Sequence, residues 1–246
     1  MLTERMIDEI SEISYTQRLP AIDEIIEDEG IKISQGTTDL EYELFVQKLY
    51  ALILNKKLIE AVELSNQLIA IGVRFNTRFD VFRHKATALY KLKRYKESLA
   101  VYEEIFSFVT ELHCSWYEFY FNAADAAEQE GLIKKSFNYY KECIFSFLED
   151  ACDRYQYRDS DYIEWLHEEF DKTWNGLTSV VSKYTQATKG DTPEKKALLK
   201  AKIQTFQDQF KSASNNLIDL EFFTEKDVFE KSNELHIILK GLLNHN

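Results

Sequence analysis

Histidine and cysteine side chains are the first candidates for metal binding or acid–base chemistry in this sequence, which contains five histidines. A zinc-binding helix carries two ligands one turn apart, and the run His167-Glu168-Glu169 has no second histidine at that spacing. His236 and His245 also lack a partner at ligand spacing. The neighbours His113 and Cys114 would point in different directions on a helix. We therefore expect no metal site and no cofactor.

Motifs for catalysis are equally scarce. The sequence has no glycine-rich phosphate loop, no Gly-x-Ser-x-Gly motif and no Ser or Cys with an evident base partner. The pair Arg78 and His84 resembles the Arg–His motif of the HEPN ribonucleases, which are also all-helical. That resemblance implies RNA cleavage, and we keep it as a minor alternative to our expectation that the chain is not an enzyme.

The composition limits the classes of partner. The chain has 42 acidic and 30 basic residues and a formal net charge of −12, so it is repelled by phosphate backbones, and we expect no nucleic-acid partner. Its three cysteines form no CxxC pair, and the start MLTERMIDEI has no apolar leader region. The longest apolar runs, such as Leu49–Leu54, are too short for a membrane span. We expect a cytoplasmic protein with reduced thiols and no membrane partner.

The elements that would position any site are helices, since 7 Gly and 2 Pro offer little turn chemistry for strands. The stretch Asp80–Phe106 carries two helical periods, separated by a short polar break at Lys91–Arg94. Two amphipathic helices joined by so short a connection fold antiparallel, as an αα-hairpin. The apolar positions of the two periods are Phe82, Ala86 and Leu89, then Tyr95, Leu99, Tyr102 and Phe106.

This hairpin resembles the tetratricopeptide repeat (TPR), a family with large, small, turn and aromatic residues at fixed offsets. The large position recurs after 37 residues, from Phe45 to Phe82, and after 38, from Phe82 to Tyr120. The resemblance covers about residues 42–148 with an atypical repeat length, and it implies an all-α, right-handed α-solenoid of TPR-like hairpins. The matching positions of the central hairpin are Phe82, Ala86, Ala88, the turn at Lys93, Tyr95, Ser98 and Tyr102.

We predict two domains. Residues 1–150 form TPR-like repeats, with a degenerate first helix pair at 3–14 and 19–29 and a second pair at 40–54 and 57–71. Residues 151–246 form a long-helix region after a polar segment at 149–161, with helices over 161–184, from Pro193 to about Ser214, and after Thr224. These helices either cap the open end of the repeats or form a separate bundle that makes a homodimer.

In the TPR family the first helix of each hairpin lines a concave groove, so the resemblance implies a site for a peptide or helix of a partner protein. Aromatic, arginine and asparagine side chains there could hold such a segment by stacking and hydrogen bonds. Alternatively, Tyr50, Tyr90 and Phe121 simply pack between helices. The Lys and Asn clamp with which some members hold a partner's terminal carboxylate is absent. The matching groove positions are Val46, Tyr50, Arg83, His84, Thr87, Tyr90, Phe121, Asn122 and Asp125.

These observations favour a non-catalytic protein–protein interaction module, a scaffold or adaptor with the partner in its groove. A second hypothesis is an acidic inhibitor or immunity-type protein that occupies a basic site on a toxin or nucleic-acid enzyme. It rests on the segment from Glu4 to Glu29, where nine acidic residues accompany only Arg5 and Arg18.

Overall fold

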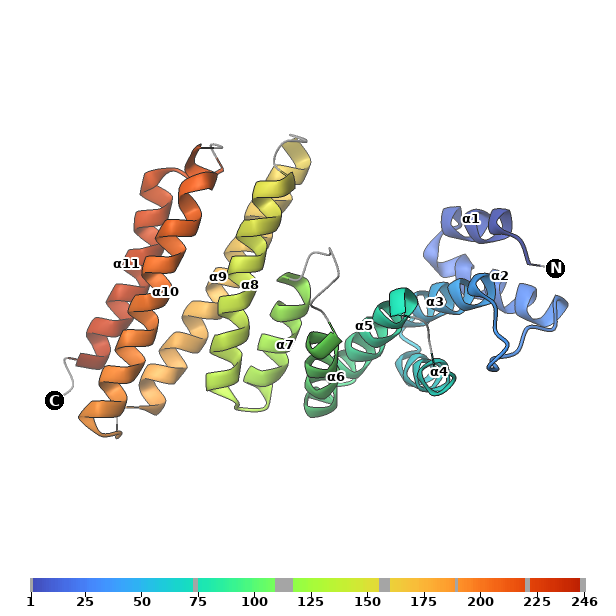
Figure 1. Ribbon diagram of the computed structural model, residues 1–246, viewed down its shortest axis with the longest axis horizontal. Coiled ribbons are helices and arrows are strands. Elements are labelled where there is room, and N and C mark those ends of the chain that lie inside the picture. Colours follow the sequence, from blue (N-terminus) through green and yellow to red (C-terminus); the bar gives the residue numbers. More distant parts are fainter. Residues whose placement is uncertain are drawn as a thin grey trace. The chain divides into compact units, whose positions relative to one another are not determined.

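The computed structural model describes residues 2–72, 75–108, 117–154, 160–188, 190–219 and 222–243. All regular elements in these ranges are α-helices (Figure 1). The chain divides into two compact units, unit 1 from Met1 to Leu112 and unit 2 from His113 to Asn246. The all-α prediction is confirmed.

Unit 1 is a series of packed helix pairs. Helices α1 and α2 pack on α3, helices α3 and α4 pack on α5, and α5 pairs with α6. The predicted start of the second helix at residue 19 is wrong, because α2 begins four residues earlier and Pro20 lies inside it. The bounds are α1 Glu4–Glu12, α2 Tyr15–Asp28, α3 Asp39–Leu54, α4 Leu58–Ala70, α5 Phe75–Lys91 and α6 Tyr95–Phe108.

Arg18 connects the first two helices. Its side chain is only 6% exposed, and Nη2 donates hydrogen bonds to the carbonyl oxygens of Ser11, at 2.5 Å, and Ile13, at 3.2 Å. The last carbonyl groups of a helix have no partner within the helix, and they form its negative end. The buried guanidinium therefore holds the C-terminal end of α1 against α2. The sequence reasoning missed this contact, because it treated Arg18 only as part of a charged surface.

Unit 2 begins with the hairpin of α7 and α8 and ends with the three long helices. Helices α8, α9, α11 and α10 pack in that order around one core, so α9 and α10 face each other across it. Aromatic rings fill the centre: those of Trp174 on α9 and Phe210 on α10 lie 4.8 Å apart. The bounds are α7 Tyr117–Gln129, α8 Ile133–Arg154, α9 Ser160–Ala187, α10 Pro193–Asp219 and α11 Glu225–Leu243.

The long helices share the core of the preceding hairpin. The predicted domain boundary at residue 150 falls inside α8, which continues to Arg154 through part of the segment expected to be a break. Phe147 of α8 and Phe170 of α9 belong to one core cluster, with rings 5.5 Å apart. This is the arrangement expected of a cap on the last repeat. A functional division into residues 1–150 and 151–246 stays a prediction.

The first helices of the hairpins α3/α4, α5/α6 and α7/α8 end with the same backbone turn. Lys56, Lys93 and Gly131 have φ angles of 61°, 59° and 70°, and so does Gly30 after α2, with 62°. In each turn the next amide donates to a carbonyl five residues back, as Arg94 does to Leu89 at 2.9 Å. This is the Schellman ending. The left-handed residues of successive turns are 37 and 38 residues apart, from Lys56 to Lys93 to Gly131. The backbone therefore repeats with the period that the sequence predicted.

Two hairpins also cross in the same way. The Ser98 hydroxyl on α6 donates to the Ala86 carbonyl on α5 at 2.9 Å, and Ser136 on α8 donates to Ala124 on α7 at 2.7 Å. All four residues are fully buried. A small residue on each side lets the backbones come close enough for this bond. The α3/α4 hairpin has Leu49 and Ala61 at these positions, so it lacks the hydroxyl donor.

Candidate partner-binding surface

The nine predicted groove residues fall in both units. Six lie on the adjacent helices α3 and α5 of unit 1, and three lie on α7 of unit 2. We call the first set the α3/α5 surface and the second the α7 surface. The α3/α5 surface consists of Val46, Tyr50, Arg83, His84, Thr87 and Tyr90, and the α7 surface of Phe121, Asn122 and Asp125.

Two members of the α3/α5 surface are buried. Val46 is 8% exposed and His84 is 6% exposed, and the His84 ring lies 5.7 Å from the Tyr50 ring between their centroids. Burial, with a smaller contribution from the positive charge of Arg83, lowers the pKa of His84 to about 3. The imidazole is therefore neutral at physiological pH, and it joins α3 to α5 as a packed aromatic ring.

Arg83 is the charged centre of the α3/α5 surface. Its side chain is 41% exposed, and its Nη2 lies 3.3 Å from Asp80 Oδ1, one turn earlier on α5. Burial raises the pKa of Asp80, and the charge of Arg83 offsets part of that rise. The Arg83 Nε is buried and has no hydrogen-bond partner among the described residues. The Nε itself is closed to solvent, so a ligand would meet the exposed part of the guanidinium.

The aromatic and hydroxyl members of this surface are partly exposed. Tyr50, Thr87 and Tyr90 all keep part of their surface open to solvent. The Tyr90 ring is held by an edge-on contact with Tyr95 of α6, at 5.5 Å between centroids. The sequence reasoning selected Arg83 but missed its partner Asp80, which the spacing of three residues on a helix could have revealed.

The α7 surface is largely covered by its own unit. The Phe121 ring packs edge-on against Tyr140 of α8 at 5.7 Å, and Lys172 Nζ of α9 lies 4.7 Å above its centroid. Asp125 accepts a hydrogen bond from Gln129 at 3.5 Å, and burial raises the pKa of its carboxyl group. Asn122 is partly exposed. Packing between helices therefore accounts for Phe121, and a groove role for these three residues stays a prediction.

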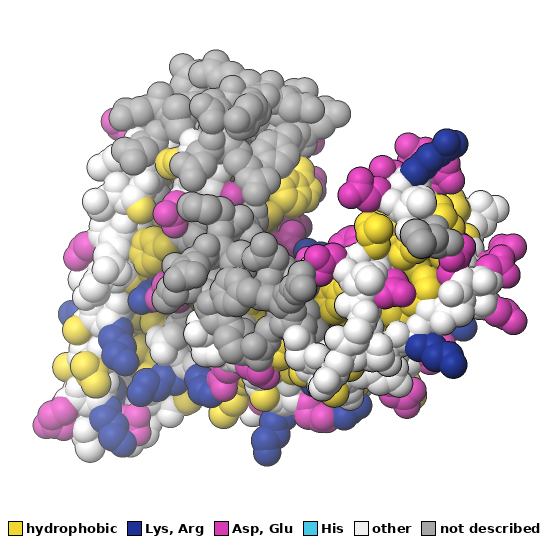
Figure 2. All heavy atoms as spheres, turned by 45° about the vertical axis from the view of Figure 1, so that its right-hand side comes forward, with side chains coloured by type: hydrophobic (Ala, Val, Ile, Leu, Met, Phe, Trp, Pro, Cys, Tyr) yellow, Lys and Arg dark blue, Asp and Glu magenta, His cyan; other side chains and the backbone are white. Residues whose placement is uncertain are grey.

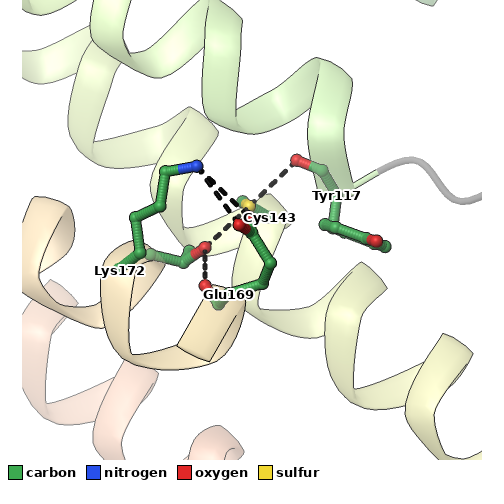
Figure 3. A network of polar contacts seen from close by, with 5 residues as sticks. Tyr117, Cys143, Glu169 and Lys172 are labelled. Atoms are coloured by element: carbon green, nitrogen blue, oxygen red, sulfur yellow. Dashed lines mark hydrogen bonds and ion pairs between the residues drawn. The ribbon is translucent and has the colours of Figure 1, made fainter. Parts of the chain in front are cut away.

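A polar network beside this surface joins α7, α8 and α9 (Figure 3). The Cys143 thiol donates to the Tyr117 carbonyl oxygen at 3.0 Å and lies 3.8 Å from Thr173 Oγ1. Thr173 donates to the Glu169 carbonyl at 2.9 Å, and Lys172 pairs with the Glu169 carboxylate at 3.3 Å. Burial raises the pKa of Cys143 to about 12, so the sulfur stays protonated. The network positions helices; a protonated thiol is a poor nucleophile.

One of the remaining histidines has a packing contact that the structure describes. His167 stacks on Phe222 with 4.1 Å between ring centroids, which is a packing role. The side chains of Arg78, His113, Cys114 and His245 lie outside the described residues, so the geometry of the Arg78–His84 pair is not tested. Across the described ranges, no three His, Cys, Asp or Glu side chains form a group that could hold a metal ion. No helix in these ranges is both long and apolar enough to cross a membrane.

Comparison with solved structures identifies the type of fold. Two crystal structures of nearly identical TPR-like repeats assigned to a kinesin light chain of Podosopora anserina, one carrying a Q17M change, are similar to this chain. Both share 12% identity with it, with TM-scores of 0.52 and 0.53, over 88% and 89% of this chain and 93% of theirs. A Rap protein complexed with Competence and Sporulation Factor matches at 13% identity and a TM-score of 0.45, over 98% of this chain and 74% of its own.

No protein-family model matches the sequence, and no curated protein matches it either. The fold is that of TPR-like helical hairpins, as the sequence resemblance predicted.

Proposed function

We propose that this protein is a non-catalytic interaction module that binds an extended or helical segment of a partner protein on the α3/α5 surface. The observation that carries the proposal is the Arg83 side chain, which is 41% exposed on the same surface as the partly exposed Tyr50 and Tyr90. TPR-like hairpins present their first helices as binding surfaces, and α3 and α5 are first helices.

The chemistry of the surface suits a peptide. A main-chain carbonyl or a carboxylate can accept from Arg83, and the partly exposed rings of Tyr50 and Tyr90 can contact apolar side chains on either side. Tyr and Arg are enriched among the residues that dominate binding energy at interfaces. Because Asp80 already neutralises part of the arginine charge, the surface does not require a strongly acidic partner.

The test is retention of a co-purifying partner on immobilised protein. We expect Arg83→Ala to reduce partner capture at least about tenfold, the scale of a strong interface residue. Arg94→Ala is the matched control, because Arg94 is an exposed arginine paired only with Glu97 at the turn between α5 and α6. Circular dichroism should show unchanged helix content in both variants. Unchanged capture by Arg83→Ala with an intact fold would refute this site.

A second candidate function is supported by the charge of the first helix pair. All nine acidic residues between Glu4 and Glu29 are exposed, whereas Arg18 is buried and Arg5 pairs with Glu9 at 2.8 Å. Asp23 also pairs with Lys48 of α3 at 2.6 Å, so the surface of α1 and α2 is acidic in excess and partly compensated, with acidic side chains visible at the right of Figure 2. Such a surface suits a basic site on a toxin or nucleic-acid enzyme.

Salt dependence separates the two candidates. An interface of exposed charges weakens steeply as ionic strength rises, because the screening length falls to about 8 Å at 0.15 M salt. If α1 and α2 bind the partner, Glu24→Lys should reduce capture and Arg83→Ala should not. Salt-insensitive capture would argue against the acidic surface.

A further inference from the structure

Unit 2 contains a pocket between α8 and α10 that none of the predictions above uses. Its volume is about 290 Å³. Phe137 of α8 and Phe206 of α10 are among its lining residues, but both are buried in the core and only 2% and 1% exposed. Ala201, a small exposed residue of α10, leaves the space open. The rim is polar and includes Asn138, Lys141, Lys202 and Gln209.

Three of the four rim groups have no polar partner among the residues that the structure describes. Lys202 makes no ion pair and Asn138 and Gln209 make no hydrogen bond with any residue that the structure describes. Lys141 pairs only with its chain neighbour Glu142, at 2.9 Å. The pocket thus presents two ammonium groups and two amides, and no carboxylate lines it.

The surroundings of the pocket are basic although the chain as a whole is acidic. The first turns of α8 carry Lys134 and Lys135, and the first half of α10 carries Lys196 and Lys200 beside Glu194 and a Lys195–Asp191 ion pair at 3.7 Å. Figure 2 shows Lys and Arg side chains gathered at the lower left of this view. A local positive field of this kind attracts acidic ligands and raises their rate of association.

The size of the pocket limits its occupant. Pockets for drug-sized ligands measure roughly 300–1,000 Å³, so this one is at or below the lower end and suits a single large side chain. We propose that the pocket anchors an acidic segment of a partner protein. One aromatic side chain of that segment packs against Ala201 and Thr205, over the small accessible parts of Phe137 and Phe206, and flanking carboxylates pair with Lys141 and Lys202. This site is distinct from the α3/α5 surface and does not depend on it.

Labelled synthetic peptides test the proposal with the full chain by fluorescence anisotropy. The probe peptide is Asp-Glu-Phe-Glu-Asp. Two control peptides each lack one feature: Asn-Gln-Phe-Gln-Asn lacks the carboxylates, and Asp-Glu-Ala-Glu-Asp lacks the aromatic ring. We expect saturable binding of the probe with a Kd below about 1 mM, and both other peptides at least about tenfold weaker. A peptide that binds as well without its charge or its ring overturns the proposal.

Variants of the protein locate the site. Lys202→Glu turns an attraction into a repulsion and should weaken the probe about tenfold. Lys211→Glu is the matched control on the same helix, because Lys211 is exposed and lies nine residues beyond Lys202, about 13 Å along the helix, and it should stay within about twofold. Ala201→Trp should abolish binding by filling the space, and its position on the surface makes a folding defect unexpected. Equal effects of the two charge reversals, or undiminished binding by Ala201→Trp, overturn the site.

Free 3-phenylpropionate distinguishes a peptide segment from a small organic acid of the same chemistry. The probe peptide should bind more tightly than 3-phenylpropionate, because its several carboxylates can pair with both Lys141 and Lys202, whereas the small acid has one carboxylate. If the small acid binds as tightly as the peptide, or if no probe saturates by about 5 mM, the assignment to a partner segment is overturned.

Discussion

The hairpins α5/α6 of unit 1 and α7/α8 of unit 2 are built alike and end in different surroundings. Both have the buried Ser-to-Ala hydrogen bond and the same left-handed turn. At one matching position, however, α5 has Arg83, with an unsatisfied Nε, and α7 has Phe121, which lies beneath Lys172 of α9. The same repeat position thus serves as a candidate contact in one hairpin and as packing in the other. What packs beside a repeat decides the role of its residues.

The close approach of α9 to α8 depends on Gly176. A Cβ added there would lie 2.5 Å from Tyr140 Cε1 and 2.6 Å from Cζ, and Tyr140 is only 2% exposed. We predict that Gly176→Ala destabilises unit 2 by about 1–3 kcal/mol through overpacking, even though alanine favours helices. Denaturant unfolding followed by circular dichroism measures the loss.

Gly190→Ala is the control for this change, because nothing lies within 4 Å of the Cβ that it adds. Hydrogen exchange should show that protection in unit 1 is unaffected by Gly176→Ala. A Gly176→Ala protein as stable as the parent would mean that α9 does not pack so closely on the hairpin.

Acid should weaken unit 1 through His84. The folded-state pKa of His84 is about 3, below its ordinary value of 6.5, so the unfolded chain takes up the proton first. Stability is then lost as pH falls from about 6.5 towards 3, by up to about 2 kcal/mol between pH 7 and pH 5. Unfolding of the parent and of His84→Phe at several pH values measures this difference.

His84→Phe keeps a ring against Tyr50 and removes the titrating group, so its stability should depend less on pH. Asp80 contributes with the opposite sign, because burial raises its pKa, but this carboxyl is present in both proteins. Parallel pH profiles for parent and variant would contradict a buried neutral histidine.

The shared crossing of the two hairpins predicts equal costs for equal changes. Ser98→Ala and Ser136→Ala should each destabilise the protein by about 1 kcal/mol, the net value of one hydrogen bond. Ser107→Ala removes only an exposed bond within α6 and should have little effect. Unequal losses for Ser98 and Ser136, measured by chemical denaturation, would show that the crossings differ in strength.

Substitutions in the turns between the paired helices should change the free energy of unfolding least. Lys93 adopts a left-handed φ of 59°, which costs a side-chain-bearing residue more than glycine. Lys93→Gly should therefore raise the unfolding free energy by about 0.5–1 kcal/mol. Gly131→Ala should lower it by a similar amount through φ alone, since nothing lies within 4 Å of the added Cβ. A shift of the melting temperature in the same direction for both variants would contradict the common turn.

Local patterns predicted the repeats because hairpins depend on contacts between residues close in sequence. The period of 37 and 38 residues and the turn at Lys93 follow from such contacts. The structure adds the matching turn at Gly131 and a reciprocal capping box of Thr38 and Glu41, which are local contacts of the same kind. The bounds of α2 and α8 were missed, since a proline and a run of charges usually end helices. Helix α2 continues across Pro20, where Arg18 makes its buried contact with α1. Helix α8 continues past residue 150, where it packs in the core of the long helices.

The candidate partner-binding surface was also only partly predictable from the sequence. The spacing of Arg83, Thr87 and Tyr90 placed them on one helix face, but it could not reveal that His84 would be buried against Tyr50 or that Lys172 would cover Phe121. The pocket between α8 and α10 was also invisible, because its two walls lie some sixty residues apart in the chain.

The amino-acid sequence by itself determined the helices, their pairing and their period, since these depend on side chains within about forty residues of one another. The tertiary structure alone decided which faces stay open. That choice depends on how α9 and α10 return to α8, and contacts between distant segments leave no periodic trace along the chain.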